Sequence, residues 1–386
     1  MKKILLTFLI IGLSVAISCN RADTTKADLA YSQTVKQLLT DFTQSREIPA
    51  MAAAVVKADT ILVSEAVGIR KLGDSTRVTA DDKFYLASNT KSVTATGIAH
   101  YVQEGEITWQ LTPIEAWPTQ VGDIHPAYHD ITLEQLLSNQ AGILPFTSGS
   151  EWSNMPDLDS LASADIPQAF ALYLLSKEPP VEPSSQFLYS NGGFAIASEM
   201  VEEVVGKTWA EYVDENIFKP LGLNAGFGHP GLHDSNQPWG HWETSEGHLV
   251  AYNPKGSYSP QAADAAAGAV HMSINDYALY LQEHLRGLNG LRTKILSPKL
   301  FKELHTPRIS LADSAGAPKY AMGWAIAEND GYTMSVHSGS GGRFKARATI
   351  IPEKDIAVAV FANSGNDAAD EAVIAVSDSL LKLFDE

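Results

Sequence analysis

Residues 84–91 read FYLASNTK and open an apolar run that continues with helical spacing to Gln103. On a helix, Ser88 and Lys91 lie one turn apart on the same face. A serine hydroxyl attacks poorly unless a base takes its proton, and a lysine sheltered from water can lose its own proton and act as that base. We therefore expect Ser88 to be a nucleophile and Lys91 its partner. An N-capping serine followed by a surface lysine is the alternative interpretation.

A second polar motif, Tyr189-Ser190-Asn191, lies in a turn ahead of a helical pattern at residues 193–205. In the functional interpretation, the Tyr189 phenol shuttles a proton between Ser88 and the leaving group. The Asn191 amide then holds Lys91 and a substrate carbonyl. The alternative is a structural turn with a half-buried tyrosine, because turns favour the string Ser-Asn-Gly.

A third motif, VHSGSGGRF at residues 336–344, lies on a late strand pattern. Gly339 lets the backbone approach a neighbouring segment closely. An edge strand here would pair with an extended substrate, while the amide groups of Ser340 and Ser88 would converge as an oxyanion hole. We therefore expect four residues of this motif to bind the substrate, namely His337, Ser338, Gly339 and Ser340.

In this order, the motifs S-x-x-K, Y-x-N and H-x-G resemble the signature of serine β-lactamases, penicillin-binding proteins and related esterases. The chain is most similar to the class C branch, which includes DD-carboxypeptidases, D-aminopeptidases and esterases. The resemblance implies a covalent acyl-enzyme at Ser88, with Lys91 and Tyr189 also catalytic and with no cofactor. It extends over nearly the whole chain beyond residue 30, through segments at residues 131–142, 217–223, 267–277 and 320–324.

The chain departs from the pattern of the penicillin-active branches in its cationic and amide-binding positions. Those branches usually carry lysine where His337 stands, and a histidine with an ordinary pKa near 6.5 is mostly neutral at pH 7. Class C β-lactamases also carry a basic residue near the start of the last helix, where residues 366–371 are acidic here, and the loop that residues 141–147 resemble usually ends in a glutamine where Thr147 stands. Arg343 or Arg347 is a candidate replacement cation, or else a solvated strand residue. We therefore expect peptidase or esterase activity ahead of β-lactam hydrolysis, with His337 gaining charge as the pH falls toward about 6.

The order of expected elements predicts an α+β fold. A helix and two strands come first, a mostly helical block follows over residues 88–285, and strands return before a final helix. This order suits an antiparallel sheet covered by helices plus a mostly helical subdomain, with the active site in the cleft between them. That is the β-lactamase/transpeptidase-like architecture implied by the resemblance. The expected helices at the two ends are residues 31–45 and 368–384, and the expected strands are residues 50–57, 60–67, 320–327, 333–337, 344–351 and 356–362.

The first residues are typical of an export signal, with charged residues followed by an apolar run. The sole cysteine, Cys19, lies in the string AISCN, which resembles the lipobox of bacterial lipoproteins. We expect a signal peptide over residues 1–18, lipid attachment at Cys19 with a flexible tether over residues 19–30, and a serine hydrolase domain over residues 31–386. The protein would then be exported and held in the cell envelope as a periplasmic or surface lipoprotein. Plain secretion is the alternative.

Composition and charge narrow the possible partners. The formal charge of -17 repels phosphate backbones, so we expect no nucleic-acid partner and membrane contact only through the lipid anchor. The histidines between residues 229 and 248 lack a zinc-binding spacing, so no metal is expected. The expected partner is a small-molecule or peptide substrate with an amide or ester bond. Two alternatives stay open: a true class C-like β-lactamase, and a non-catalytic peptidoglycan-binding or sensor lipoprotein that keeps the cleft.

Overall fold

The computed structural model describes residues 26–385 except 148, 154, 156–157, 159–160, 256–261 and 330. The expected signal peptide, the lipid site at Cys19 and the first part of the tether lie outside these residues. Helix α1 (Lys26–Ser45) begins before Tyr31, so the last residues of the expected tether are helical. Across the part of the chain that is described, no helix has the length and hydropathy needed to cross a membrane.

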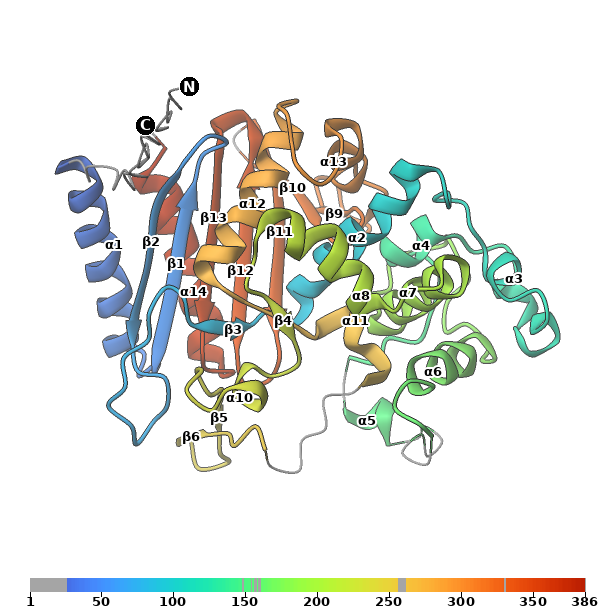
Figure 1. Cartoon of the computed structure of the whole chain (residues 1–386), viewed down its shortest axis with the longest axis horizontal. Helices are drawn as coiled ribbons and strands as arrows, with labels where there is room; N and C mark the ends of the chain where they lie inside the picture. The colour runs from blue at the N-terminus through green and yellow to red at the C-terminus, as the bar shows by residue number, and fades with distance from the viewer. Residues whose placement is uncertain are drawn as a thin grey trace, which may run out of the picture.

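The largest element is an antiparallel sheet of eight strands, which confirms the expected fold class (Figure 1). Strands from both chain ends build it, because β1 (Ala50–Val56) pairs with β2 (Ile61–Gly68) on one side and with β13 (Ile356–Ala362) on the other. The remaining strands continue in the order β12 (Lys345–Ile351), β11 (Tyr332–Ser340), β10 (Ala325–Asn329), β9 (Lys319–Tyr320) and β8 (Ile309–Ser310).

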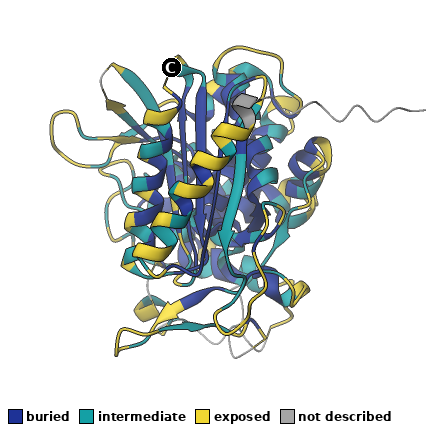
Figure 2. Cartoon of the chain, turned by 90° about the vertical axis from the view of Figure 1, so that its left-hand side faces the viewer, coloured by how far each residue is buried: buried dark blue, intermediate teal, exposed yellow. Residues whose placement is uncertain are grey.

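Both faces of this sheet are buried under helices. Every residue of β1 is buried, and alternate side chains enter two separate hydrophobic cores. Met51, Ala53 and Val55 pack on the face covered by α1 and α14 (Asp367–Leu383). Ala52, Ala54 and Val56 pack on the opposite face, which is covered by α12 (Ile274–Leu288). Figure 2 shows the sheet strands in dark blue behind a helix with an exposed outer face.

A mostly helical part lies beside the sheet, as expected (Figure 1). Its interior contains α2 (Thr90–Glu104) and α7 (Asn191–Val205), which are buried along most of their length. Smaller helices surround them: α3 (Pro113–Ala116), α4 (Leu133–Leu137), α5 (Gly149–Trp152), α6 (Ile166–Leu175), α8 (Trp209–Val213), α9 (Lys219–Leu221) and α11 (Ala265–Gly268). Helix α13 (Pro298–Leu304) packs on α12, and α10 (Pro230–His233) lies below the large sheet in Figure 1. Two small sheets complete the fold: β3 (Lys83–Tyr85), β7 (Val270–Ser273) and β4 (Gly226–Phe227), and β5 (His241–Glu243) with β6 (Leu249–Ala251).

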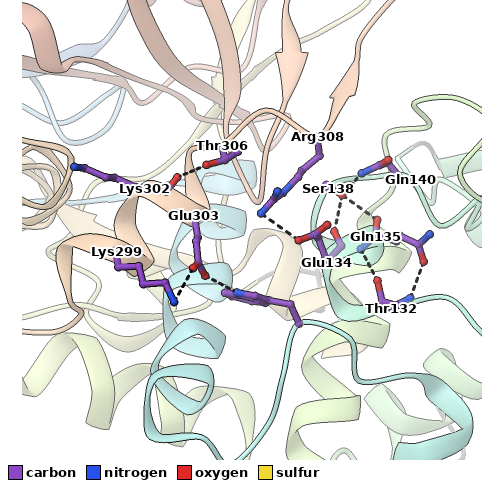
Figure 3. Close-up of polar contacts among 11 residues, drawn as sticks. Thr132, Glu134, Gln135, Ser138, Gln140, Lys299, Lys302, Glu303, Thr306 and Arg308 are labelled. Carbon is purple, nitrogen blue, oxygen red and sulfur yellow. Dashed lines mark hydrogen bonds and ion pairs between the residues drawn. The ribbon is translucent and has the colours of Figure 1, made fainter.

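Polar contacts join the sheet side to the helical part (Figure 3). Arg308, just before β8, forms an ion pair of 3.1 Å with Glu134 of α4. The Trp109 indole N–H donates to Glu303 of α13 at 2.9 Å. Helix α4 starts with a capping box, in which the Thr132 hydroxyl accepts from the Gln135 amide at 3.3 Å. The Arg308–Glu134 and Trp109–Glu303 contacts therefore help to fix the two parts relative to each other.

The single strand expected at residues 320–327 is wrong, because a turn divides it into β9 and β10. Gly323 in this turn has a φ of +78°. A Cβ there would lie 2.8 Å from the Lys91 carbonyl oxygen and 2.9 Å from the Ser92 Cα. The turn therefore packs its backbone directly on α2, and this tertiary contact overrides the local strand pattern.

Candidate active site

Ser88 lies at a strained turn between β3 and α2. The Leu86 amide donates to the Val270 carbonyl at 2.9 Å, which fixes the end of β3. Ala87 then has a φ of +46°, a conformation that costs a non-glycine residue about 1–3 kcal/mol. One 3₁₀ turn, Ala87–Asn89, follows and leads into α2 at Thr90. This geometry leaves the Ser88 side chain half-buried in the wall of a cleft.

Lys91 is completely buried beside Ser88, so the surface-lysine alternative is wrong. Its ammonium has three acceptors: Ser88 Oγ at 3.3 Å, Asn191 Oδ1 at 2.7 Å and the Ala267 carbonyl at 3.0 Å. Burying a charged amine is costly unless its donors are satisfied, and these three acceptors match its three protons. Lys91 is therefore held within proton-transfer reach of the Ser88 hydroxyl.

Asn191 and Tyr189 join this group from the start of α7. Ser190 caps the helix by accepting from the Gly193 amide at 2.9 Å, and its hydroxyl donates to Leu144 at 2.8 Å. The Asn191 amide nitrogen donates to the Phe146 carbonyl at 2.9 Å, which turns Oδ1 toward the lysine. The Lys91 ammonium lies 4.8 Å from the centre of the Tyr189 ring. This contact involves the face of the ring and not the phenol hydroxyl. The proton-shuttle role of Tyr189 therefore stays a prediction.

Strand β11 approaches the serine turn closely at Gly339. A Cβ at this glycine would overlap the Leu86 carbonyl oxygen and would lie 3.2 Å from the Ser88 amide nitrogen. The ladder between β10 and β11 ends at Val336, so residues 337–340 pair only with β12. The end of β11 therefore provides the expected edge, and Ser340 lines the cleft. The oxyanion-hole role of the Ser88 and Ser340 amides stays a prediction.

The structure does not place the His337 side chain in the lining of the cleft, so its expected substrate contact stays a prediction. The ring is buried and turned to Tyr320, whose hydroxyl lies 3.0 Å from Nε2, while Nδ1 lies 3.0 Å from the Ser338 carbonyl. Because a carbonyl only accepts, Nδ1 carries the proton and Nε2 accepts from the phenol. Burial, together with the nearby Lys91 charge, lowers the pKa of His337 to about 3. A pKa this low disfavours the expected gain of charge toward pH 6, which stays a prediction.

The side chain of Ser338 does not line the cleft either. Its hydroxyl accepts from the Arg347 guanidinium at 3.1 Å across the β11–β12 ladder. Arg347 is thus engaged on the sheet, whereas Arg343 lines the cleft with its guanidinium carbon 3.8 Å from the centre of the Tyr252 ring. Of the two candidate cations, Arg343 is the one at the site.

Asp264 is a site residue that the motifs did not reveal. It precedes α11, and its carboxylate lies 3.4 Å from the Asn191 amide nitrogen. Burial raises the pKa of Asp264 to about 6, opposed by the Lys91 charge and by hydrogen bonds from its own backbone and from Asn191. The family-like segment at residues 267–277 begins just after it. The proximity of Asp264 to this segment was the one sequence signal that could have indicated it as a site residue.

These residues surround a cleft of about 430 Å³ at the junction of the sheet and the helical part. Thr147, at the place of the expected glutamine, lies in its wall. The lining of the cleft is mostly polar, and aromatic and small apolar residues also contribute, including Tyr85, Phe146, Trp152, Ala265, Ala267 and Ala269. Such a wall suits a small organic or peptide group.

The histidines considered for metal binding form no such site among the described residues, where no cluster of possible metal ligands occurs. His241 uses both ring nitrogens inside the protein, because Nε2 accepts from the Leu72 amide at 3.0 Å and Nδ1 lies 2.6 Å from the Asn363 carbonyl. Burial lowers the pKa of His241, which keeps the ring neutral. Its role is therefore to connect two backbone segments.

Comparison with known proteins agrees with this geometry. The family model described as Beta-lactamase matches residues 35–380. An unguisins hydrolase of Aspergillus campestris is 26% identical over 87% of this chain and 62% of its own length. A D-aminopeptidase of Brucella ovis is 24% identical over 86% of this chain and 59% of its own length. The chain thus spans about three fifths of the length of these two relatives.

A solved structure, the octameric penicillin-binding protein homologue from Pyrococcus abyssi, has the same fold. It superposes with a TM-score of 0.75 and 24% identity, covering 91% of this chain and 77% of that one. Together with the family match over most of the chain, this likeness accounts for the sheet, the helical part and the cleft between them. The chain belongs to the Beta-lactamase family.

Proposed function

We propose that the protein is a serine hydrolase that cleaves an amide or ester through a covalent acyl-enzyme at Ser88. The observation that carries this proposal is the buried Lys91 ammonium 3.3 Å from Ser88 Oγ. In its neutral form, the lysine accepts the hydroxyl proton while Oγ bonds to the substrate carbonyl carbon. The bond to the leaving group then breaks, and the proton passes to that group through Lys91 or Tyr189. Water releases the acyl group in a second, equivalent step.

Peptidase or esterase activity is favoured over β-lactam hydrolysis. The neutral, buried His337 offers no charge to a substrate carboxylate, and the start of α14 is acidic. A true class C-like β-lactamase is the second candidate, and Arg343 at the cleft is the observation that favours it. A non-catalytic binding or sensor protein is the third, but such a protein has no need of a buried lysine beside the serine.

We also propose that the protein is exported and anchored by lipid at Cys19. The apolar run before this cysteine and the polar residues after it support that location. The catalytic domain would then meet its substrate in the cell envelope.

Intact-mass measurement tests the proposed chemistry. The protein is incubated with a fluorophosphonate, an activated ester and a penicillin, alongside Ser88→Ala and the control Ser314→Ala, at an exposed serine away from the cleft. We expect adducts on wild type and on Ser314→Ala but none on Ser88→Ala. The preferred acyl donor separates the candidates: an ester adduct without a penicillin adduct supports the peptidase or esterase, and rapid penicillin turnover supports the β-lactamase. Absence of every adduct would favour the binding protein.

A further inference from the structure

The cleft beside Ser88 is lined by two charged side chains of opposite sign. Among its described lining residues, Asp264 is the one carboxylate and Arg343 the one cation. The Arg343 guanidinium is stacked against Tyr252. Lys91 lies behind the wall, fully buried, and does not face the cleft. A carboxylate that faces a substrate cleft is available to an incoming cation.

The contacts of Asp264 inside the protein leave acceptor capacity unused. Its amide partner, Asn191, is at the long distance of 3.4 Å, and the same Asn191 nitrogen donates to Phe146 at 2.9 Å. Among the described side chains, none forms an ion pair with this carboxylate at 4 Å or less. An ionised carboxylate offers about four acceptor positions, so the side turned to the cleft has room for a further donor.

The charge state of Asp264 suits such a donor. Because its pKa is raised only to about 6, the carboxylate is mostly ionised at pH 7 and above. It is also close to the reacting centre, since Asn191 links it to Lys91 and Lys91 contacts Ser88. A cationic group that enters the cleft loses part of its hydration, and a nearby anion offsets that cost.

We propose that Asp264 binds a free amino group on the acyl part of the substrate, beside the carbonyl that Ser88 attacks. This inference rests on the proposed acyl transfer at Ser88. The ammonium donates to the Asp264 carboxylate, while the side chain of the acyl residue lies against Phe146 and Trp152 in the cleft wall. The enzyme would accordingly select amino-terminal residues with a free amine over the same residues with an acylated nitrogen.

Matched substrates test this selection. Alanine p-nitroanilide and N-acetylalanine p-nitroanilide, each in D and L form, are compared by kcat/KM on wild type, Asp264→Asn and Asp264→Glu. We expect wild type to prefer the free amine in at least one stereochemical series. Asp264→Asn should reduce that preference about 10- to 100-fold, mainly through KM, as expected for losing a charge-assisted hydrogen bond. Asp264→Glu, which keeps the charge, should retain part of the preference.

Two controls separate selection from a structural effect. Glu246→Gln removes the same charge from the exposed turn between β5 and β6 and should leave the preference unchanged. The rate of labelling by a fluorophosphonate, which has no amine, reports the state of Ser88 directly. Equal loss on both substrates and on labelling would overturn the inference in favour of a positioning role for Asp264.

The remaining outcomes are also decisive. Intact labelling of Asp264→Asn with an unchanged preference overturns the amine-binding role and leaves the Ser88 chemistry standing. A wild-type preference for the acetylated substrates in both the D and the L series also overturns the amine-binding role and leaves the Ser88 chemistry standing. Failure of the fluorophosphonate to label wild type overturns the proposed function and this inference together.

Discussion

Replacing Lys91 with methionine removes the group that the account makes the base while keeping a side chain of similar length. Loss of a positioned general base lowers acylation about 10²- to 10⁴-fold, which is about 3–5 kcal/mol in activation free energy. The effect on stability is much smaller, within about 2 kcal/mol, because two opposing terms nearly cancel. The variant leaves Asn191 Oδ1 and the Ala267 carbonyl without their donor, but it also removes a fully buried charge.

The assay is the rate of fluorophosphonate labelling, measured with thermal melting on Lys91→Met, Tyr189→Phe and the double variant. Because both residues serve one proton transfer, the double variant should be hardly slower than Lys91→Met alone. Lys345→Met is the matched control, since Lys345 of β12 is also buried but its ammonium pairs with Asp370 of α14 at 3.3 Å. Labelling of Lys91→Met at the wild-type rate would contradict the role of Lys91 as the base. Additive effects of the two substitutions on the labelling rate would contradict a shared proton transfer.

Three further predictions concern the backbone, the pH response and the anchor. Gly339→Ala should abolish labelling and lower the melting temperature, because its Cβ would overlap the Leu86 carbonyl; unchanged labelling would contradict the close approach. Burial and the neighbouring Glu202 charge raise the pKa of Glu199 from 4.5 to about 8, so the stability that Glu199 contributes falls as the pH rises through that range. Glu199→Gln should therefore raise the melting temperature by a few degrees at pH 9 and little at pH 5, and an equal effect at both would be evidence against the shift. Cys19→Ser should move the protein from the membrane to the soluble fraction with loss of the lipid mass; unchanged fractionation and mass would leave plain secretion.

The positions of the residues proposed to react were the most predictable part of the site. Ser88 and Lys91 are three residues apart at a helix start, so local geometry alone brings them together. Tyr189 and Asn191 are about 100 residues away in the sequence, and only the order of the motifs indicated that they join Ser88 and Lys91 in one site. The structure puts Asn191 on Lys91 at 2.7 Å and the Tyr189 ring beside it. Chemistry that depends on short sequence spacing is therefore visible before folding.

The direction of a strand side chain was not visible in the same way. His337 lies on the predicted strand, but whether its ring faces the cleft or Tyr320 depends on packing between distant segments. Its burial, and hence its lowered pKa, also follows from that packing. Asp264 was missed because a single aspartate in an alanine-rich stretch has no motif, and only the fold brings it to Asn191.

The most direct measurement of the central claim is peptide mapping of the protein quenched during turnover of an activated ester. We expect a mass increase equal to the acyl group, located on Ser88 alone and absent from the Ser88→Ala protein. An acyl group on any other residue, or full acylation of the Ser88→Ala protein, would contradict it.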